Sequence, residues 1–392
     1  MKRRWYVALV LGLLTPGLGQ TYNGQLPKAI GLGVAGIAAA LLLCYATVLL
    51  DLPRFALIAC LAASLLIQPA IAVEAALQAS RLPREFVPRR YNNWRYYVLY
   101  LVAFTLAVEL PSALLFQSRA RVFRMPTSSM ENTLLIGDYV VVDAGAFRGG
   151  KRPSPNDLIA FHHIGAQELD LVKRVVACSG QSVRLEGTSL WVDGQLVPAP
   201  RGVKYAKGGE NPLALGAFAV TVPVLGQVFE PQKLTIRDFS FLYYVAKQEM
   251  KGHSVVGSVQ VYVDGAFRKE VPLADIGNQA RLLVGLEYEF GVETSRLSVH
   301  PILKIDGAPV QRYSVSTPLY FVLGDNRDNS FDSRDFGFVS HAALIGKARY
   351  ILYSTGRNES ILYSTEGNES FFDLVLDVVR FARWARIGQR TE

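Results

Sequence analysis

The chain has 392 residues, half of them hydrophobic, and a formal net charge of +8 at pH 7. This length exceeds the size at which one hydrophobic core stops growing, so we expect at least two structural units. Three cysteines exclude a small protein held together by a disulfide framework. The positive charge suits nucleic acid, an anionic membrane surface or an acidic substrate. We favour the membrane surface over nucleic acid because arginines cluster beside the apolar runs.

The chain begins with a basic and then apolar stretch, MKRRWYVALVLGLL, which is similar to a secretory signal sequence. Its apolar part is short, and no clear small-residue cleavage site follows it. We therefore expect residues 1–27 to form a cytoplasmic or interfacial re-entrant segment.

Residues 28–118 contain three apolar runs that predict transmembrane helices. The first, at 29–50, has no charged residue, and a helix of that length covers about 30 Å of hydrocarbon. The others lie at about 55–77 and 96–117. The loop before the third run is predicted to be cytoplasmic because of its basic residues, which are Arg81, Arg84, Arg89, Arg90 and Arg95. We therefore expect a multi-pass protein of the cytoplasmic membrane, in contact with lipid, whose remaining chain lies on the extracytoplasmic side.

After residue 130 the pattern changes to short runs of alternating and β-branched residues, such as DYVVVD and SLWVDGQLV. Asp-Gly pairs at Asp193, Asp264 and Asp306 are typical of two-residue hairpins, because a type I′ turn needs positive φ at both central positions. The sequence therefore predicts a membrane-anchored all-β protein with transmembrane α-helices at its N-terminus.

We expect one β domain to be formed by residues 119–196 together with 318–370. The residues between them, 197–317, are too many for a simple connection and predict an inserted β-rich subdomain. ILYSTGRNES is followed by the near-copy ILYSTEGNES, which indicates a tandem duplication. In the tail, 371–392, apolar residues at helical spacing beside arginines predict an amphipathic helix, lying in the membrane interface or packed on the β domain.

The histidines predict no metal site and the sequence no cofactor. The adjacent pair His162 and His163 falls on a predicted strand, where neighbouring side chains point to opposite faces. No His/Asp relay can be assigned, so a nucleophilic serine would need another base, and lysine is the available alternative.

Two short stretches bring hydroxyl and amine groups into apolar surroundings. MPTSSMENTLLIGD, from Met125 to Asp138, crowds three hydroxyls between a proline and an apolar run. In LDLVKRVVA the alternation places Lys173 among apolar residues, and burial there would lower the pKa of its amine enough for it to act as a neutral base. The alternative for this second stretch is an edge strand with solvated Lys and Arg.

Three separated stretches, taken in order, resemble the type I signal peptidases of bacteria, which are serine proteases with a Ser/Lys dyad. MPTSSMENTLLIGDYVVVD is similar to the nucleophile box of that family, LDLVKRVVACSG to its lysine box and GDNRDNSFDSRDFGFV, at 324–339, to its C-terminal signature. The resemblance covers the catalytic core but not 197–317 or the first two apolar runs. The third stretch also has the composition of a polar loop, which is compatible with a catalytic role.

The resemblance implies a reacting pair and an oxyanion hole. Ser129 matches the nucleophile and Lys173 its general base. Thr127 and the Ser129 backbone N–H would stabilise the developing oxyanion, and Ser128 would be a spacer. Two positions depart from the family pattern: Ser128 replaces a usual glycine and Asn132 a usual proline. If the glycine served a positive φ, Ser128 would strain the oxyanion hole.

The resemblance also implies residues that orient the lysine and support the site. Ser330 matches the serine that hydrogen-bonds the lysine amine. Asp332 and Arg334 match an ion pair that braces the site, and Asp325 is a further supporting position.

The implied substrates are signal peptides of exported precursors, cleaved after small residues of the A-x-A pattern. We expect an extended cleft that pairs the peptide as an added strand over shallow apolar pockets. Ordinary core packing is an equal alternative for two of the lining residues, Leu134 and Val172. The full implied lining is Phe123, Met125, Met130, Leu134, Leu171 and Val172.

Two other functions remain open alongside the peptidase, which we expect to be monomeric. The first is a non-catalytic, membrane-anchored module that binds signal peptides on the same fold, for which the departures at Ser128 and Asn132 are the hints. The second is an assembly role for the N-terminal apolar segments, with the β region secondary.

Overall fold

The computed structural model describes residues 3–49, 54–83, 87–164, 168–205, 218–273, 286–355, 386 and 389–391. The chain divides into two compact units. Unit 1 is Met1–Arg121 with Gly388–Arg390, and unit 2 is Val122–Ile387 with Thr391–Glu392. The second ILYST copy lies outside the described residues, as does the predicted tail helix except for residues 386 and 389–391.

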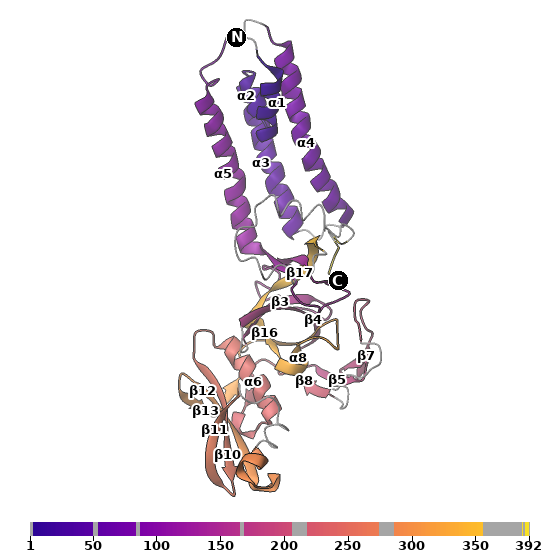
Figure 1. The fold of residues 1–392 in the computed structure, drawn as a ribbon, viewed down its shortest axis with the longest axis vertical. Helices are drawn as coiled ribbons and strands as arrows, with labels where there is room; N and C mark the ends of the chain where they lie inside the picture. The colour runs from indigo at the N-terminus through magenta and orange to yellow at the C-terminus, as the bar shows by residue number, and fades with distance from the viewer. Residues whose placement is uncertain are drawn as a thin grey trace. The chain divides into compact units, whose positions relative to one another are not determined.

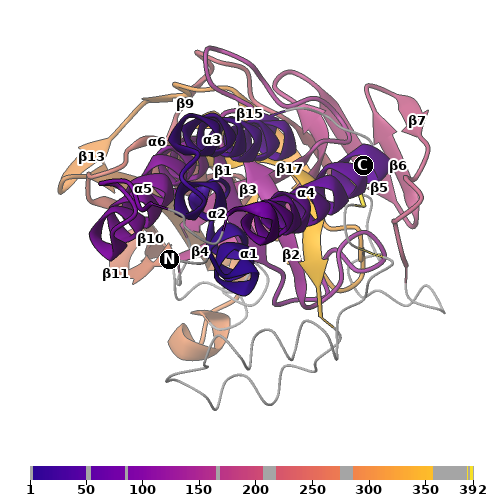
Figure 2. The ribbon, with the colours of Figure 1, turned by 90° about the horizontal axis from the view of Figure 1, so that it is seen from above.

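Helices make up the described part of unit 1. Helix α1 packs along α4, and α3 packs along α5 (Figures 1 and 2). Gly12 allows α1 to approach α4 closely, because it has no side chain. A Cβ at this position would lie only 2.8 Å from the Cα of Ala72 in α4. The helices are α1 (Trp5–Leu14), α2 (Leu18–Tyr22), α3 (Leu26–Leu49), α4 (Arg54–Arg81) and α5 (Trp94–Arg119).

The three helices predicted at 29–50, 55–77 and 96–117 are present as α3, α4 and α5, and the predicted segment 1–27 contains α1 and α2. Within the described part of the chain, none of the helices combines the length and apolar character that a membrane crossing requires. The helical prediction is thus confirmed, whereas the predicted membrane crossings are not.

Unit 2 is built around a seven-stranded sheet with the order β1-β2-β17-β3-β4-β15-β16. Strands β17, β3, β4 and β16 are labelled in Figure 1. The sheet joins strands from before residue 197 to strands from after residue 317. Strand β4, which carries LDLVKRVVAC, lies between β3 and β15. Lys173 and Arg174 are 2% and 3% exposed, so the alternative of an edge strand with solvated Lys and Arg is wrong. The strands are β1 (Ala120–Arg124), β2 (Asp138–Asp143), β3 (Leu158–Ile164), β4 (Glu168–Cys178), β15 (Leu319–Leu323), β16 (Val339–Ser340) and β17 (Leu344–Ser354).

Two smaller four-stranded sheets have the orders β7-β6-β5-β8 and β11-β10-β12-β13, and β9 pairs with β14. The first of them extends across residue 197, and the boundaries of the inserted subdomain stay a prediction. The strands are β5 (Ser182–Glu186), β6 (Ser189–Val192), β7 (Gln195–Val197), β8 (Phe218–Thr221), β9 (Val228–Phe229), β10 (Val255–Val263), β11 (Ala266–Pro272), β12 (Leu297–Ile305), β13 (Ala308–Val310) and β14 (Tyr313–Ser314).

The three predicted Asp-Gly hairpins are confirmed. Asp193, Asp264 and Asp306 have φ of 51°, 51° and 50°, and the glycine after each also has positive φ. They join β6 to β7, β10 to β11 and β12 to β13. Paired positive φ values at the two central positions are what a type I′ turn requires.

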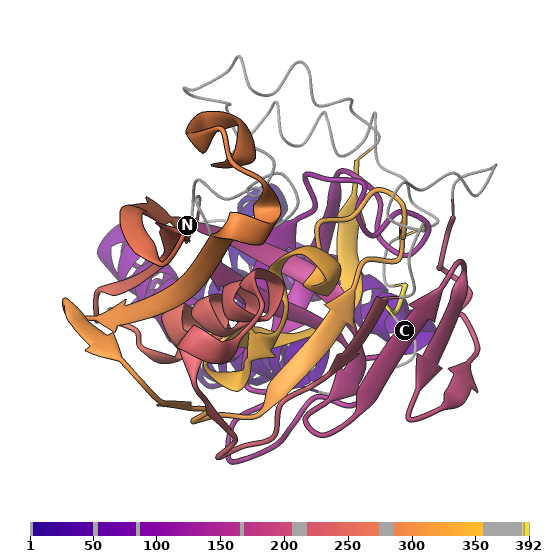
Figure 3. The same cartoon turned by 90° about the horizontal axis from the view of Figure 1, so that it is seen from below.

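The expectation of an all-β region is corrected by helix α6, Ile236–Glu249 (Figure 3). Thr235 caps it by accepting a hydrogen bond from the Asp238 N–H at 3.1 Å. Phe239, Leu242 and Val245 then recur at helical spacing and enter the largest described apolar core of unit 2. Unit 2 is therefore β-rich with an internal helix. Shorter turns are α8 (Ser333–Phe336) and the 3₁₀ segments Pro231–Lys233, Thr294–Arg296 and His341–Ala343.

Candidate active site

Lys173 and Ser129 meet in the interior of unit 2. Lys173 is on β4, where it pairs with Ile159 of β3, and its Nζ lies 2.7 Å from Ser129 Oγ. Lys173 is 2% exposed and Ser129 8% exposed. Burial lowers the pKa of the Lys173 amine from 10.5 to about 8, although the Asp332 and Asp325 carboxylates act in the opposite direction. The amine therefore loses its proton at a pH slightly above neutral, well below the range of a solvated lysine.

Ser129 lies in the turn-rich segment between β1 and β2. The exposed Thr127 donates a hydrogen bond from its hydroxyl to Ser129 Oγ at 3.2 Å. The Glu131 N–H donates to the Ser128 carbonyl at 2.9 Å and closes a turn around the nucleophile. The two residues predicted to form the oxyanion hole thus lie side by side.

The two departures from the family pattern have different structural consequences. Ser128 does not adopt a positive φ, so a side chain in place of glycine causes no backbone strain there. Asn132 has a φ of 80°, in the left-handed region that asparagine tolerates. Proline, fixed near −65°, could not take this conformation, so the backbone after Met130 requires a residue other than proline.

The ion pair predicted between Asp332 and Arg334 is present. Arg334 Nε and Nη2 donate to the two Asp332 carboxylate oxygens at 2.8 and 2.9 Å, and Asp332 is fully buried. The same carboxylate accepts from the Gly324 N–H at 3.0 Å. Asp332 therefore ties the start of the 324–336 loop to its end.

Asp325 forms a second buried ion pair, with Arg174. Arg174 Nε and Nη2 donate to the Asp325 carboxylate at 2.8 and 2.6 Å, and Thr133 Oγ1 donates to it at 2.5 Å. Arg174 and Thr133 were not among the predicted site residues. The sequence feature that could have indicated Arg174 is its position next to Lys173 on one strand, in a chain that also contains an aspartate-rich loop.

The predicted hydrogen bond from Ser330 to the lysine amine is not made. Ser330 Oγ is buried and has no hydrogen-bond partner among the described residues. It lies against Gly324 instead, where a Cβ would come within 2.1 Å of Ser330 Oγ and 2.6 Å of the Ser129 carbonyl oxygen. The amine takes its direction from Ser129, and Ser330 contributes packing at the glycine.

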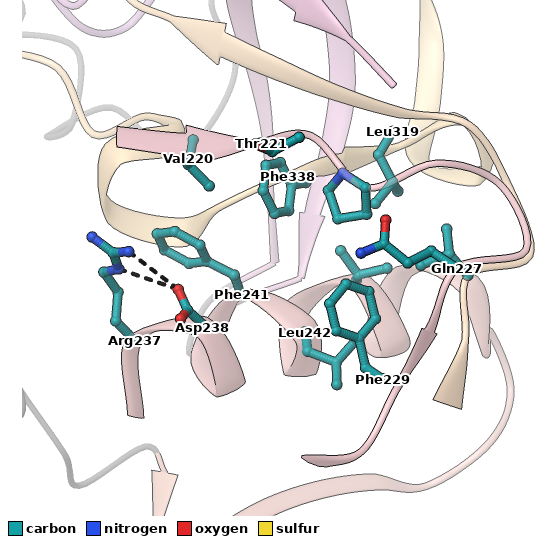
Figure 4. A pocket seen from close by; sticks show the side chains of 13 residues that line it. Val220, Thr221, Gln227, Phe229, Arg237, Asp238, Phe241, Leu242, Leu319 and Phe338 are labelled. Carbon is teal, nitrogen blue, oxygen red and sulfur yellow. Dashed lines mark hydrogen bonds and ion pairs between the residues drawn. The ribbon is translucent and has the colours of Figure 1, made fainter. Parts of the chain in front are cut away.

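The predicted substrate-lining residues fall into two groups. Phe123 and Leu171 are partly exposed. The other four are buried in one apolar cluster and include Leu134 and Val172, for which core packing was an open alternative; they are Met125, Met130, Leu134 and Val172. A separate cavity of about 280 Å³ lies between α6, β8 and β15, and none of the predicted site residues lines it (Figure 4).

The two histidines of β3 have different environments. His162 Nδ1 is 2.8 Å from the Asp170 carboxylate, whereas His163 is buried against the rings of Phe331 and Phe336. In the described part of the chain, no group of three or more His, Cys, Asp or Glu side chains is arranged to hold a metal ion.

Comparisons with known proteins identify relatives of this chain. The family described as signal peptidase, peptidase S26, matches residues 94–241 and 250–353, which is more than half of the chain. Signal peptidase I of Aquifex aeolicus is 27% identical over 275 residues, covering 69% of this chain and 90% of that protein. Signal peptidase I of Haemophilus influenzae is 26% identical over 269 residues, covering 64% and 69%.

Proposed function

Because the chain belongs to the signal peptidase family, peptidase S26, and is thereby a serine endopeptidase that removes signal peptides, we propose that Ser129 is its nucleophile and Lys173 its general base. The observation that carries this proposal is the 2.7 Å contact between Lys173 Nζ and Ser129 Oγ, made by an amine that is only 2% exposed. A desolvated lysine is neutral over a useful pH range and can then accept a proton.

In this mechanism the neutral Lys173 amine accepts the hydroxyl proton of Ser129 as Oγ attacks the scissile carbonyl. The negative oxygen of the tetrahedral intermediate is stabilised by the Thr127 hydroxyl and the Ser129 N–H. Collapse breaks the C–N bond, the leaving amine takes the proton from Lys173, and an acyl-enzyme forms on Ser129. Lys173 then deprotonates a water molecule, whose attack releases the signal peptide and restores the serine.

The buried ion pairs support this arrangement by fixing the elements that carry the dyad. Asp325 joins its loop to Arg174, the neighbour of Lys173 on β4, while Asp332 and Arg334 hold the rest of that loop. Each carboxylate has an arginine partner, which satisfies the buried charges.

We propose that the substrate adds to β4 as an extended strand. The pairing of β15 with β4 begins at Arg174, whereas β3 pairs with β4 from Glu168 onward. The other edge of β4 before Lys173 therefore has backbone groups that a peptide could pair with, next to the dyad. Phe123 and Leu171 would contact small side chains of the A-x-A pattern, above the buried layer that contains Met130 and Leu134.

We also propose that unit 1 anchors the enzyme in the cytoplasmic membrane, with unit 2 on the extracytoplasmic side and lipid in contact with the helices. Support comes from large apolar side chains that are exposed on α3, α4 and α5, such as Leu42, Leu66 and Leu99. Sedimentation of the chain with membranes after alkaline washing tests this point. Recovery in the soluble fraction would contradict it.

The experiment for the catalytic assignment is incubation of the purified chain with a precursor that carries an A-x-A site, followed by mass measurement of both products. The wild type should cut once after the last alanine, and Ser129→Ala should fold but leave the precursor intact. Ser182→Ala, at a surface serine on β5, is the matched control and should cleave normally. Precursor binding without turnover by the wild type would instead favour the non-catalytic module.

A further inference from the structure

Asn326 holds both peptide groups that flank the nucleophile. Its side-chain Nδ2 donates to the Ser128 carbonyl oxygen at 3.0 Å, and its backbone N–H donates to the Ser129 carbonyl oxygen, also at 3.0 Å. Asn326 follows β15 and is 5% exposed. A residue far from Ser129 in the sequence therefore helps to set the direction of two consecutive peptide planes at the reacting hydroxyl, together with the Glu131 N–H, which also donates to the Ser128 carbonyl.

The orientation of the Asn326 amide is fixed by its own partners. Besides the Ser128 carbonyl, Nδ2 donates to Glu131 Oε2 at 3.3 Å, and that carboxylate also accepts from Lys204 Nζ at 2.8 Å. The Ser128 carbonyl and the Glu131 carboxylate can only accept hydrogen bonds, so the amide group that faces them must be the Asn326 nitrogen and not its oxygen.

The consequence for catalysis follows from the planarity of the peptide bond. The Ser128 C=O and the Ser129 N–H belong to one rigid, trans peptide unit and point in opposite directions. Holding the carbonyl oxygen therefore aims the N–H. Among the described residues, the Ser129 N–H donates to no other group, so it is available to an incoming oxygen.

We propose that Asn326 is a positioning residue for the oxyanion hole, which keeps the Ser129 N–H aimed at the oxygen that becomes negative in the tetrahedral intermediate. This inference rests on the proposed roles of Ser129 and Lys173. Donors that are held in place before the reaction need no reorganisation in the transition state, and removing one such donor costs about 10²- to 10³-fold in kcat. Loosening a donor rather than deleting it should cost less, about 10- to 100-fold.

Ser128 supplies a second attachment to the same loop. Asn329 Nδ2 donates to Ser128 Oγ at 2.9 Å, and the Asn329 N–H donates to the Asn326 carbonyl at 3.0 Å. A glycine at 128 would lack the hydroxyl acceptor. The residue expected to be a spacer thus helps Asn326 to hold the peptide unit of the oxyanion hole.

The test uses Asn326→Ala and Asn326→Leu in the full chain, with the wild type alongside. Both variants remove the amide and keep the backbone N–H that binds the Ser129 carbonyl, and leucine also keeps most of the side-chain volume. We expect kcat for an A-x-A precursor to fall about 10- to 100-fold with KM unchanged. The pH at half-maximal kcat should not move, because the surroundings of the Lys173 amine are unaltered.

A peptide aldehyde ending in alanine gives a second readout. Its adduct with Ser129 places a tetrahedral oxygen in the oxyanion hole, so its inhibition constant should rise by about the same factor as kcat falls. Gln248→Ala is the matched control, since Gln248 is also a buried amide that holds backbone groups, at Phe338 and Ser340. It should lower the unfolding midpoint and leave kcat and aldehyde binding unchanged.

The cleavage assay distinguishes an error in the proposed function from an error in the positioning role of Asn326. If the wild type does not cleave, the proposed function is wrong. If the wild type cleaves, unchanged kcat in both Asn326 variants overturns the positioning role. So does a loss that appears in KM, shifts the pH midpoint or only matches the fraction of unfolded protein.

Discussion

Replacing Lys173 by methionine should abolish cleavage and make the protein more stable at pH 7. Burial lowers the pKa of this amine from 10.5 to about 8. At about 1.4 kcal/mol per pH unit, the charged amine then costs the fold about 3 kcal/mol. Methionine has a similar length and no charge, so it should recover most of that free energy. A buried group that destabilises the fold in this way is retained for its chemistry.

The pH dependence of this difference is specific. Below pH 8 the amine is charged in both the folded and the unfolded chain, and the whole cost is present. Between pH 8 and 10.5 only the unfolded chain keeps the proton, so the stability of the wild type rises with pH. Above pH 10.5 the cost has disappeared.

Urea unfolding of the wild type and Lys173→Met, measured at pH 7, 8, 9 and 10, tests this reasoning. The free-energy difference should be about 3 kcal/mol in favour of the variant at pH 7 and should shrink as the pH rises. Other titrating groups cancel because they are common to both proteins. A difference that stays constant with pH, or a variant that is less stable throughout, would refute the desolvation of the amine.

Three further outcomes are expected. The kcat of the wild type should rise with pH and level off above about 8, because the neutral Lys173 is the base; a profile that falls over this range in a precursor assay would contradict it. Gly324→Ala should abolish cleavage, since a Cβ would lie 2.1 Å from Ser330 Oγ and 2.6 Å from the Ser129 carbonyl, and normal rates in the folded variant would disprove this crowding. Arg386→Ala should lower the free energy of unfolding by about 3 kcal/mol, because Arg386 Nη2 pairs with the buried Asp138 at 2.5 Å. Urea unfolding with the exposed Arg148→Ala as control checks the last point, and equal losses in both variants would count against it.

The hairpin turns and the long helices could be predicted because each depends on residues that are close together in the sequence. Each Asp-Gly turn could be predicted from the φ requirement of a two-residue hairpin, and helices α3, α4 and α5 from the long apolar runs in the sequence. Helix α6 was missed because its apolar residues lie among many aromatic and β-branched ones, which also suit strands. Its start was nevertheless marked by Thr235 three residues before Asp238.

Ser129 and Lys173 could be predicted because each lies in a recognisable sequence motif. The residues that surround them depend on tertiary contacts, which a motif does not specify. Arg174 is adjacent to Lys173, yet its partner Asp325 lies on a distant loop, and no sequence spacing links the two. The expected hydrogen bond of Ser330 was wrong for the same reason. A motif assigned the serine to the site, but the close approach at Gly324 decides where its hydroxyl lies.

The central claim is that the Ser129 oxygen, activated by Lys173, attacks the substrate. Its most direct test is to quench the reaction with an A-x-A precursor in acid within one turnover and locate the acyl group by mass spectrometry of proteolytic fragments. The signal peptide should be found esterified to Ser129 in the wild type and absent from Ser129→Ala and Lys173→Met. An acyl group on another residue, or turnover by Ser129→Ala, would contradict the account.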